Sequence, residues 1–258
     1  MKPKILLFDI ENTPIVTYAW GIHDDPMHST KFVKEDWKIM CWAAKWLDEK
    51  KIHFSSMYKC KSDKNLLKDL WWLLNQADVV IAHNGKQFDV RKSNARFIQH
   101  GFNPPSPYKI IDTLLIARKH FMFTSNRLGD LGNYLGVGSK METGGFDLWL
   151  DCLAGKKKSW DKMGRYCKAD VLLLERVYLK LRPYIANHPN LSVLMTKETA
   201  HCPKCGHKDL INNGFKYLVS GKFQRFLCKK CWGHGRYKVN TLEKETTKQR
   251  RVKLTVNG

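Results

Sequence analysis

Acidic residues are scarce in this chain of 258 residues: 24 Asp and Glu stand against 45 Lys and Arg, which gives a formal net charge of +21. Long apolar stretches are absent as well, and without a run of 18 apolar residues no transmembrane helix is expected. The short apolar run at 5–8 is broken by Asp9 and Glu11, which makes the N-terminus a poor secretory signal. These absences argue against a membrane protein and against a secreted disulfide scaffold.

Basic residues are what the sequence has in excess. They favour a polyanionic partner, because each phosphate neutralised by Lys or Arg releases bound counterions. A solvated basic surface without any partner is the alternative. The excess is densest in residues 197–258, which carry 15 Lys and Arg against 4 Asp and Glu.

The eight cysteines fall into two groups. Four are scattered, namely Cys41, Cys60, Cys152 and Cys167, and four form two CxxC pairs near the C-terminus. Scattered thiols without a secretory signal predict a reducing cytoplasm. In that compartment paired CxxC sequences favour metal binding over disulfide formation.

Hydrophobic patterning predicts an α/β or α+β fold in which a sheet carries helices on its faces. The expected strands are 4–10, 14–22, 38–47, 52–58, 78–82 and 109–112. The expected helices are 63–76, 88–100, 112–121, 127–135 and 159–182, and the Gly- and Lys-rich segment 136–158 is interpreted as an irregular loop or insertion. Apolar residues make up 43% of the chain, which is enough for a substantial core.

Asp9 and Glu11 end the first expected strand. Residues two apart in a strand point to the same face, so the two carboxylates project together. Like charges held that close repel, and a hard divalent cation such as Mg²⁺ or Mn²⁺ would compensate them. Taken alone, an acidic pair at a strand end is more often simply solvated.

Two further segments carry residues at positions where side chains can reach a site, namely a strand-to-helix junction and one face of a helix. Asn84, Phe88 and Asp89 lie where a short apolar strand gives way to a helix, and Tyr166 and Asp170 share one face of a later helix. Each has an ordinary interpretation: a turn residue for Asn84, core packing for Phe88, a helix N-terminal charge for Asp89, and a solvent-facing acid for Asp170.

Together the three segments resemble the DEDD (DnaQ-like) 3′–5′ exonuclease superfamily in its tyrosine subtype. The motifs Asp-x-Glu, Asn-x-x-x-Phe-Asp and Tyr-x-x-x-Asp occur in the family order within residues 4–182. The resemblance implies a ribonuclease H-like mixed sheet flanked by helices. It is strongest to the proofreading domains of family-B DNA polymerases and to phage-borne stand-alone exonucleases, which implies a bacterial or phage-infected host cytoplasm.

The same resemblance implies the chemistry of the site. Asp9, Glu11, Asp89 and Asp170 would hold two Mg²⁺ or Mn²⁺ ions, with Asp9 bridging both. Tyr166 would orient the attacking water, because an unperturbed tyrosine titrates near pH 10 and is a poor base at neutral pH. The terminal nucleotide would leave as a nucleoside 5′-monophosphate.

Substrate and partners follow less directly. Asn84 and Phe88 would shape the slot for the terminal nucleotide. DNA is favoured over RNA, as single strands or 3′ ends, with replication or recombination proteins as further partners and no membrane. The alternative is a non-catalytic nucleic-acid-binding or partner-recruiting protein on a nuclease scaffold. Asp112, at the start of an expected helix, is interpreted as its N-cap.

The two CxxC pairs predict a structural zinc site. Their four thiolates, Cys202, Cys205, Cys228 and Cys231, suit tetrahedral Zn²⁺, and the 22 residues between the pairs leave room for a β-hairpin. The segment resembles zinc ribbons of some transposases and other DNA-associated proteins, and its basic and aromatic residues suit nucleic-acid binding. His201, His207 and His234 are interpreted as surface residues.

The resulting domain prediction has four parts. A ribonuclease H-like exonuclease domain spans 1–185, a linker 186–197, the zinc ribbon 198–240 and a basic tail 241–258.

Overall fold

The computed structural model describes residues 3–19, 30–195 and 199–244. The chain divides into two compact units, of which one is Pro3–Leu181 and the other begins at Arg182. Within the described ranges every helix is too short or too polar to cross a membrane.

A five-stranded mixed sheet forms the centre of the first unit, in the order β5-β4-β1-β6-β7. The strands are β1 Ile5–Asn12, β4 Ile39–Trp46, β5 Ile52–Ser56, β6 Val79–Ala82 and β7 Lys109–Asp112. Strand β4 runs antiparallel to both of its neighbours, β1 and β5, and β6 and β7 run parallel to β1. Seven of the eight residues of β4 are buried because helices cover both faces of the sheet.

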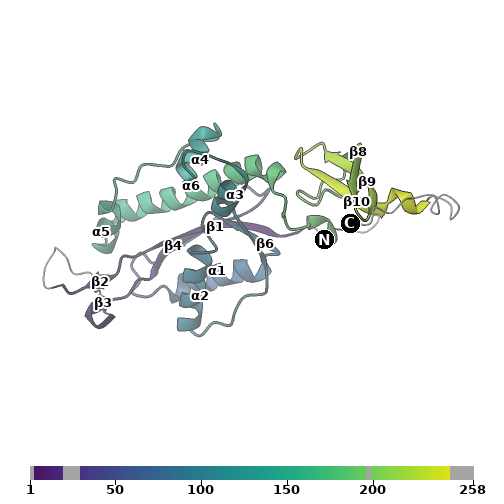
Figure 1. Cartoon of the computed structure of the whole chain (residues 1–258). Coiled ribbons are helices and arrows are strands. Elements are labelled where there is room, and N and C mark those ends of the chain that lie inside the picture. Colours follow the sequence, from purple (N-terminus) through teal and green to yellow (C-terminus); the bar gives the residue numbers. More distant parts are fainter. Residues whose placement is uncertain (1–2, 20–29, 196–198, 245–258) are drawn as a thin grey trace. The chain divides into compact units, whose positions relative to one another are not determined.

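Helices lie on the two faces of this sheet (Figure 1). On one face lie α1 Lys64–Gln76 and α2 Asp89–Gln99; on the other lie α3 Thr113–His120, α4 Leu128–Tyr134, α5 Asp147–Leu153 and α6 Lys157–Leu181. The apolar stripe that predicts α1 is buried at all five of its leucines, Leu66, Leu67, Leu70, Leu73 and Leu74. A sheet flanked by helices confirms the predicted α/β class.

Two expectations need correction. The strand predicted over 14–22 is only the two residues of β2, Val16–Thr17, paired with β3, Val33–Glu35; residues 20–22 lie outside the described part. The segment 136–158 is not wholly irregular, because α5 forms within it and α6 begins at Lys157. Short elements such as these, surrounded by Gly and Lys, carry too few residues to show a period.

The second unit contains a three-stranded antiparallel sheet in the order β10-β9-β8. Its strands are β8 Leu210–Leu218, β9 Gly221–Cys228 and β10 His234–Asn240, and 3₁₀ turns lie at Arg182–Tyr184, Leu191–Leu194 and Thr241–Lys244. Within the segment predicted as a linker, Leu191 is buried and donates its N–H to the carbonyl of Pro203. Most of the basic tail, residues 245–258, lies outside the described ranges.

Candidate active site

Strand β1 carries two carboxylates on the face covered by α6. Asp9 and Glu11 alternate with Ile10, so they share a face, and their partners on β4 are Ala43 and Cys41. The alanine opposite Asp9 leaves the space above the sheet to the carboxylate and to the helix that packs over it. The strand parity seen in the sequence therefore places both acids toward α6.

Helix α6 supplies the third carboxylate. Cys167 is buried against β1, with its Sγ 3.8 Å from the carbonyl oxygen of Asp9, and this contact fixes which face of α6 meets the strand. Asp170 follows on the same face, where its side chain is almost fully buried. One carboxylate oxygen from each of Asp9, Glu11 and Asp170 lies within 4.8 Å of the other two.

Asp89 contacts β1 from α2, which lies on the face of the sheet opposite α6. It is the first residue of α2, and its Oδ1 accepts the backbone N–H of Ile10 at 3.2 Å. This N–H is available because β6 pairs with β1 only at Ile5–Leu7. Asp89 is buried and adds to the negative charge at Asp9, but it is not one of the three acids whose oxygens gather.

The site is strongly electronegative. Burial raises the pKa of Asp9 well above its usual value, and repulsion from the other three carboxylates raises it further. Burial likewise raises the pKa of Glu11 to about 8 and of Asp89 to about 7, and it raises the pKa of Asp170. With Asp89 and Asp170 buried and Asp9 and Glu11 half-buried beside them, these carboxyl groups need positive charge nearby to remain ionised at neutral pH.

The donor set fits a hard divalent cation. Asp9 Oδ2 and Asp170 Oδ1 are buried and have no hydrogen-bond partner among the described residues. Buried acceptors without a donor are costly unless something positive meets them. Carboxylate oxygens are the ligands that Mg²⁺ and Mn²⁺ prefer. Asp9, Glu11 and Asp170 are thus suited to hold such an ion, with Asp89 beside them.

The turn that carries Asn84 is held by Asp112. Its carboxylate accepts the N–H groups of Asn84 and Lys86, both at 3.0 Å, and it also caps α3, which confirms the predicted N-cap. Asn84 has a positive φ of 67°, and a Cβ on Gly85 would lie 2.4 Å from the Cβ of Ala82. Only glycine fits that close approach, so this turn is built to present the start of α2.

Phe88 is the N-cap residue of α2 and is half-buried beside Asp89. The ammonium of Lys92 lies 5.2 Å from the centre of its ring. The structure therefore places Asn84 and Phe88 on the turn next to Asp89, at the edge of the carboxylate cluster.

Tyr166 and Lys140 complete the cluster, and no motif in the sequence singles out Lys140. Lys140 Nζ donates to the Tyr166 hydroxyl at 2.7 Å and forms an ion pair of 2.8 Å with Asp170 Oδ2. Burial opposes the charge on Lys140, but Asp170 outweighs that effect and raises the pKa of the ammonium. Burial, reinforced by Asp170 and Glu11, raises the pKa of Tyr166, so the phenol stays protonated.

The four CxxC cysteines come together in the second unit. Their Sγ atoms all lie within 4.8 Å of one another, with Cys202 and Cys231 at 3.6 Å and Cys205 and Cys228 at 3.6 Å. Hydrogen bonds from Cys202 and Cys205 lower the pKa of the Cys231 thiol, and hydrogen bonds within the same group raise the pKa of Cys205. Four sulfur ligands at this spacing fit a tetrahedral zinc ion.

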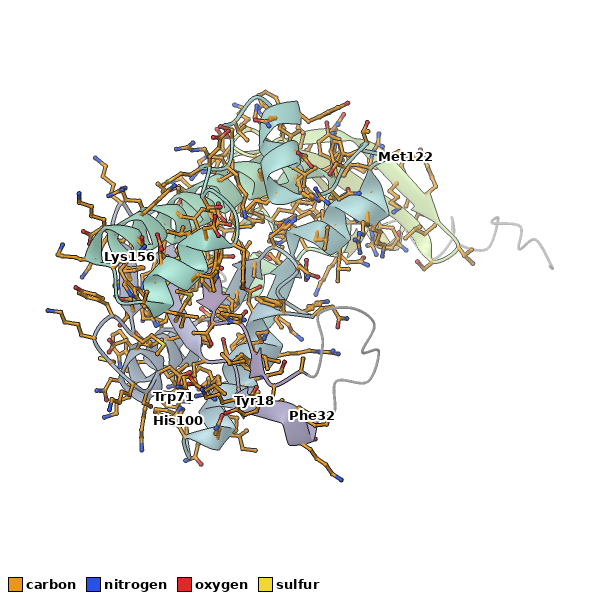
Figure 2. The ribbon with its side chains drawn as sticks, turned by 90° about the vertical axis from the view of Figure 1, so that its left-hand side faces the viewer. Tyr18, Phe32, Trp71, His100, Met122 and Lys156 are labelled. Atoms are coloured by element: carbon orange, nitrogen blue, oxygen red, sulfur yellow. The ribbon has the colours of Figure 1, made fainter. Side chains whose placement is uncertain are left out.

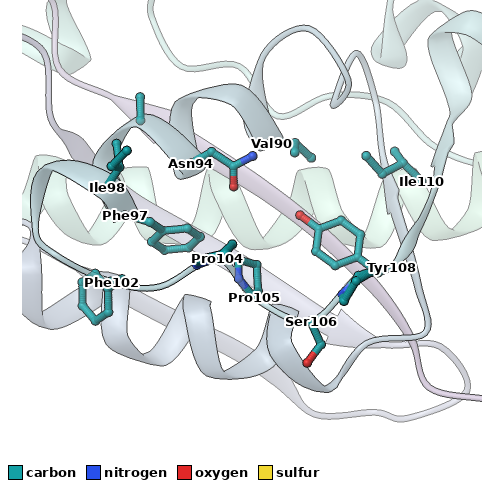
Figure 3. A pocket seen from close by; sticks show the side chains of 12 residues that line it. Val90, Asn94, Phe97, Ile98, Phe102, Pro104, Pro105, Ser106, Tyr108 and Ile110 are labelled. Atoms are coloured by element: carbon teal, nitrogen blue, oxygen red, sulfur yellow. The ribbon is translucent and has the colours of Figure 1, made fainter.

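Two hollows lie on the first unit away from the carboxylates. One, of about 710 Å³, lies between α2 and the loop that follows it; Phe97, Phe102, Pro105 and Tyr108 are among its walls (Figure 3). It contains none of the acids described above. The other, of about 750 Å³, includes Thr13, two residues beyond Glu11, and is lined by charged side chains together with polar and apolar ones.

Comparisons with known proteins agree with this geometry. The family model described as the RNase_H superfamily matches residues 6–182. The fold is similar to that of the family B DNA polymerase from the hyperthermophilic archaeon Pyrobaculum calidifontis, with a TM-score of 0.52 and 14% identity over 71% of this chain. The match spans only 26% of the polymerase. None of the curated proteins compared with the chain matches it.

Proposed function

Because the chain belongs to the RNase_H superfamily, we propose that it is a two-metal-ion 3′–5′ exonuclease that releases nucleoside 5′-monophosphates. One observation carries the proposal: oxygens of Asp9, Glu11 and Asp170 lie within 4.8 Å of one another, and two of these acids have buried oxygens without a donor among the described residues. In this ribonuclease H-like fold, β1 carries Asp9 and Glu11, and α6 carries Asp170. The polarity of cleavage rests on the likeness of the three motifs to the DEDD exonucleases.

The carboxylates supply the metal ligands. Asp9, Glu11 and Asp170 would hold one Mg²⁺ or Mn²⁺ ion, and Asp9 and Asp89 the second. When bound, such a pair stabilises both the attacking and the leaving oxygen of a phosphodiester. The protein's own contribution is a fixed set of ligands that repel one another, and a bound cation would relieve that repulsion.

Tyr166 and Lys140 act on the water side of the site. The protonated Tyr166 hydroxyl can donate a hydrogen bond or accept one, and Lys140 holds it in place through their 2.7 Å contact. Tyr166 is therefore a positioning residue for the attacking water. Asn84 and Phe88, on the turn beside Asp89, would border the terminal nucleotide.

The four-cysteine unit would be a zinc ribbon that grips the substrate. Its sheet has a hollow of about 550 Å³ lined by Phe215, Tyr217, Arg225 and Arg236, among others. Lys222 Nζ lies 4.1 Å from the centre of the Phe215 ring. Basic groups against aromatic rings suit contacts with a phosphate backbone and with unpaired bases. We propose DNA as the substrate and replication or recombination proteins as further partners.

The decisive experiment uses oligonucleotides labelled at the 3′ or the 5′ end, as single-stranded and double-stranded DNA and RNA. With Mg²⁺, a 5′-labelled strand should shorten stepwise, and a 3′-labelled strand should lose its label at once as a mononucleotide. Chelation should stop the reaction, and added Mg²⁺ should restore it. Asp9→Ala should abolish cleavage, while Asp69→Ala, which removes an exposed carboxylate of α1, should not.

A non-catalytic nucleic-acid-binding protein is the competing function. It predicts oligonucleotide binding with no Mg²⁺-dependent cleavage of any of these substrates. Full cleavage by Asp9→Ala would also refute the assigned site, since that variant has lost the acid whose pKa all three of the other carboxylates raise.

A further inference from the structure

Residues 13–19 follow the end of β1 and residues 30–38 precede the start of β4, and both segments expose aromatic side chains. Tyr18 is 65% exposed and Phe32 38% exposed. The Tyr18 N–H donates to the carbonyl of Phe32 at 2.9 Å, so the two residues are neighbours, as Figure 2 also shows. Large aromatic rings that stay exposed do not serve a core, so their role lies at the surface.

Cationic side chains accompany these rings. Lys34 Nζ lies 5.7 Å from the centre of the Tyr18 ring. Lys92 Nζ lies 3.7 Å from the centre of the Trp37 ring and 5.2 Å from that of Phe88. Lys92 is three residues beyond Asp89 on α2, so this stack stands within one helical turn of a catalytic carboxylate.

The same segment is tied directly to the catalytic strand. The Thr13 N–H donates to the carbonyl of Lys38, and the Lys38 N–H donates to Thr13 Oγ1, both at 2.9 Å. The hollow of about 750 Å³ opens here. Its charged lining residues are Lys34, Lys38, Lys61 and Arg96, against Glu35 and Asp36. Arg96 is paired with the buried Asp63, but the three lysines still exceed the two acids, so the charge along the hollow is slightly positive, in contrast to the acidic cluster.

From this arrangement we propose that Tyr18, Phe32, Lys34, Trp37 and Lys92 form an aromatic–basic strip that binds single-stranded nucleic acid upstream of the scissile nucleotide. Aromatic faces stack with any unpaired base, and the ammonium groups contact the phosphates between bases. In a duplex the bases are stacked on one another and cannot reach these rings. This inference rests on the proposed function and assigns its substrate: a strand that is single for several nucleotides from its 3′ end.

A protein partner fits the strip less well. Lysine is depleted in protein–protein interfaces, whereas lysines next to aromatic rings are typical of single-strand binding surfaces. The strip also begins at the catalytic edge, where an exonuclease substrate must enter, and this continuity favours a nucleic-acid strand.

The experiment compares a small substrate with single strands of increasing length. The p-nitrophenyl ester of thymidine 5′-monophosphate reports the chemistry alone, because it has no upstream nucleotides. Single-stranded oligonucleotides of about two to about eight nucleotides report the strip. The variants are Tyr18→Ala and Lys34→Glu, both at exposed positions, and Trp37→Ala with Trp37→Phe as its conservative partner. Trp72→Ala, which removes an exposed tryptophan of α1, is the matched control.

The strip predicts that Tyr18→Ala and Trp37→Ala raise KM for the longer strands roughly 5- to 100-fold, as expected for a lost stacking contact. Turnover of the small ester should stay unchanged, and Trp37→Phe should recover most of the loss. The same substitutions are also made in a protein that carries Asp170→Asn and is therefore inactive. Fluorescence anisotropy with a labelled single strand should then show the same loss of affinity without any catalysis.

If Tyr18→Ala and Lys34→Glu left both KM and affinity for long strands unchanged, the proposed strip would be wrong, and the proposed exonuclease activity would still stand. An equal loss on the ester and on the long strands would overturn it too, because the strip acts only on upstream nucleotides. If the unaltered protein hydrolyses neither substrate, the proposed function fails instead, and the anisotropy series still decides the strip.

Discussion

Lys140 forms an ion pair of 2.8 Å with Asp170, a contact that brings a loop residue into the centre of the carboxylate cluster. The same ammonium donates to the Tyr166 hydroxyl at 2.7 Å. One side chain thus neutralises part of the acidic charge and also holds the Tyr166 hydroxyl, which in the proposed function orients the attacking water. Removal of this ammonium should therefore affect catalysis and metal binding differently.

Replacing Lys140 with Met should lower kcat about 100-fold, because the Tyr166 hydroxyl and the water that it orients lose their anchor. Mn²⁺ binding, measured by titration calorimetry, should hold or tighten, since the ammonium no longer opposes a second cation beside Asp170. Lys140→Arg keeps the charge and should retain more activity than Lys140→Met. A parallel loss of metal affinity and kcat in Lys140→Met would mean that the lysine merely supports the fold.

The carboxylate of Asp9 should destabilise the folded protein when no metal is bound, because it repels its neighbours. Burial and three neighbouring carboxylates raise its pKa, so a neutral Asn of the same shape removes repulsion. Asp9→Asn should therefore melt higher than the unaltered protein in chelator, by roughly 2–4 °C for about 1 kcal/mol in a chain of this size. Its melting temperature should no longer rise with added Mg²⁺.

Differential scanning calorimetry with and without Mg²⁺ checks this prediction. Asp69→Asn is the control, because that carboxylate is exposed and should change neither value. If Asp9→Asn melted lower in chelator and still gained stability from Mg²⁺, Asp9 would be structural and would hold no metal.

A second buried acid, Asp63, stabilises the fold without touching the site. Its carboxylate accepts Arg96 Nε at 2.7 Å and Nη2 at 2.6 Å, and it also contacts His100 Nε2 and the N–H of Ile39. Burial alone would raise the pKa of Asp63, but the hydrogen bonds from Arg96 and His100 outweigh it and hold that pKa below its usual value. These bonds join the starts of β4 and α1 to α2.

Arg96→Met should cost about 3–5 kcal/mol in urea unfolding, because it leaves the Asp63 charge buried without its main partner. The sign of the pH dependence follows from the lowered pKa. The stabilisation by Asp63 is fully present above its unfolded pKa of about 4, and it is lost as pH falls through the lower folded value. Asp151→Asn, at an exposed pair with Lys156, should change the unfolding midpoint little at any pH.

The sequence predicted most of what depends on local periodicity. Strand parity placed Asp9 and Glu11 on one face, and helical spacing placed Tyr166 and Asp170 on another; the fold then brought oxygens of Asp9, Glu11 and Asp170 within 4.8 Å of one another. The order of these acids along the chain was enough to predict that they meet, because each one lies at the end of, or within, a long regular element.

Contacts made by loops could not be predicted in this way. Lys140 lies among glycines with positive φ, such as Gly138 and Gly144, and its reach to Asp170 depends on the whole path of that loop. Helix α5 is only seven residues long, too short for a period to stand out. The Asp63–Arg96 pair joins residues 33 positions apart on separate elements, and a charge in a sequence does not reveal its partner.

The four-cysteine unit should depend on zinc while the first unit does not. One buried cluster of this unit consists of the thiols, with Cys205 and Leu210 packed against Cys202, Cys228 and Cys231. Phe223 and Phe226 of β9 are buried as well, but a core of this size stabilises a fold only weakly without metal. Cys202→Ser should lose the bound zinc and the fold of this sheet, since metal binding supplies much of the folding free energy of so small a unit. Zinc content by atomic absorption and heteronuclear NMR of the β8–β10 amides measure both effects.

Cys60→Ser is the matched control, because Cys60 is an exposed thiol in the first unit and should change neither the zinc content nor the spectra. In Cys202→Ser the small phosphodiester should still turn over at the unaltered rate, since the carboxylates lie in the unit Pro3–Leu181. Affinity for a long oligonucleotide should fall, because the surface that holds Arg225 and Arg236 is lost with the sheet. Intact β8–β10 resonances in zinc-free Cys202→Ser would show that the cysteines pack as ordinary core residues and do not bind zinc.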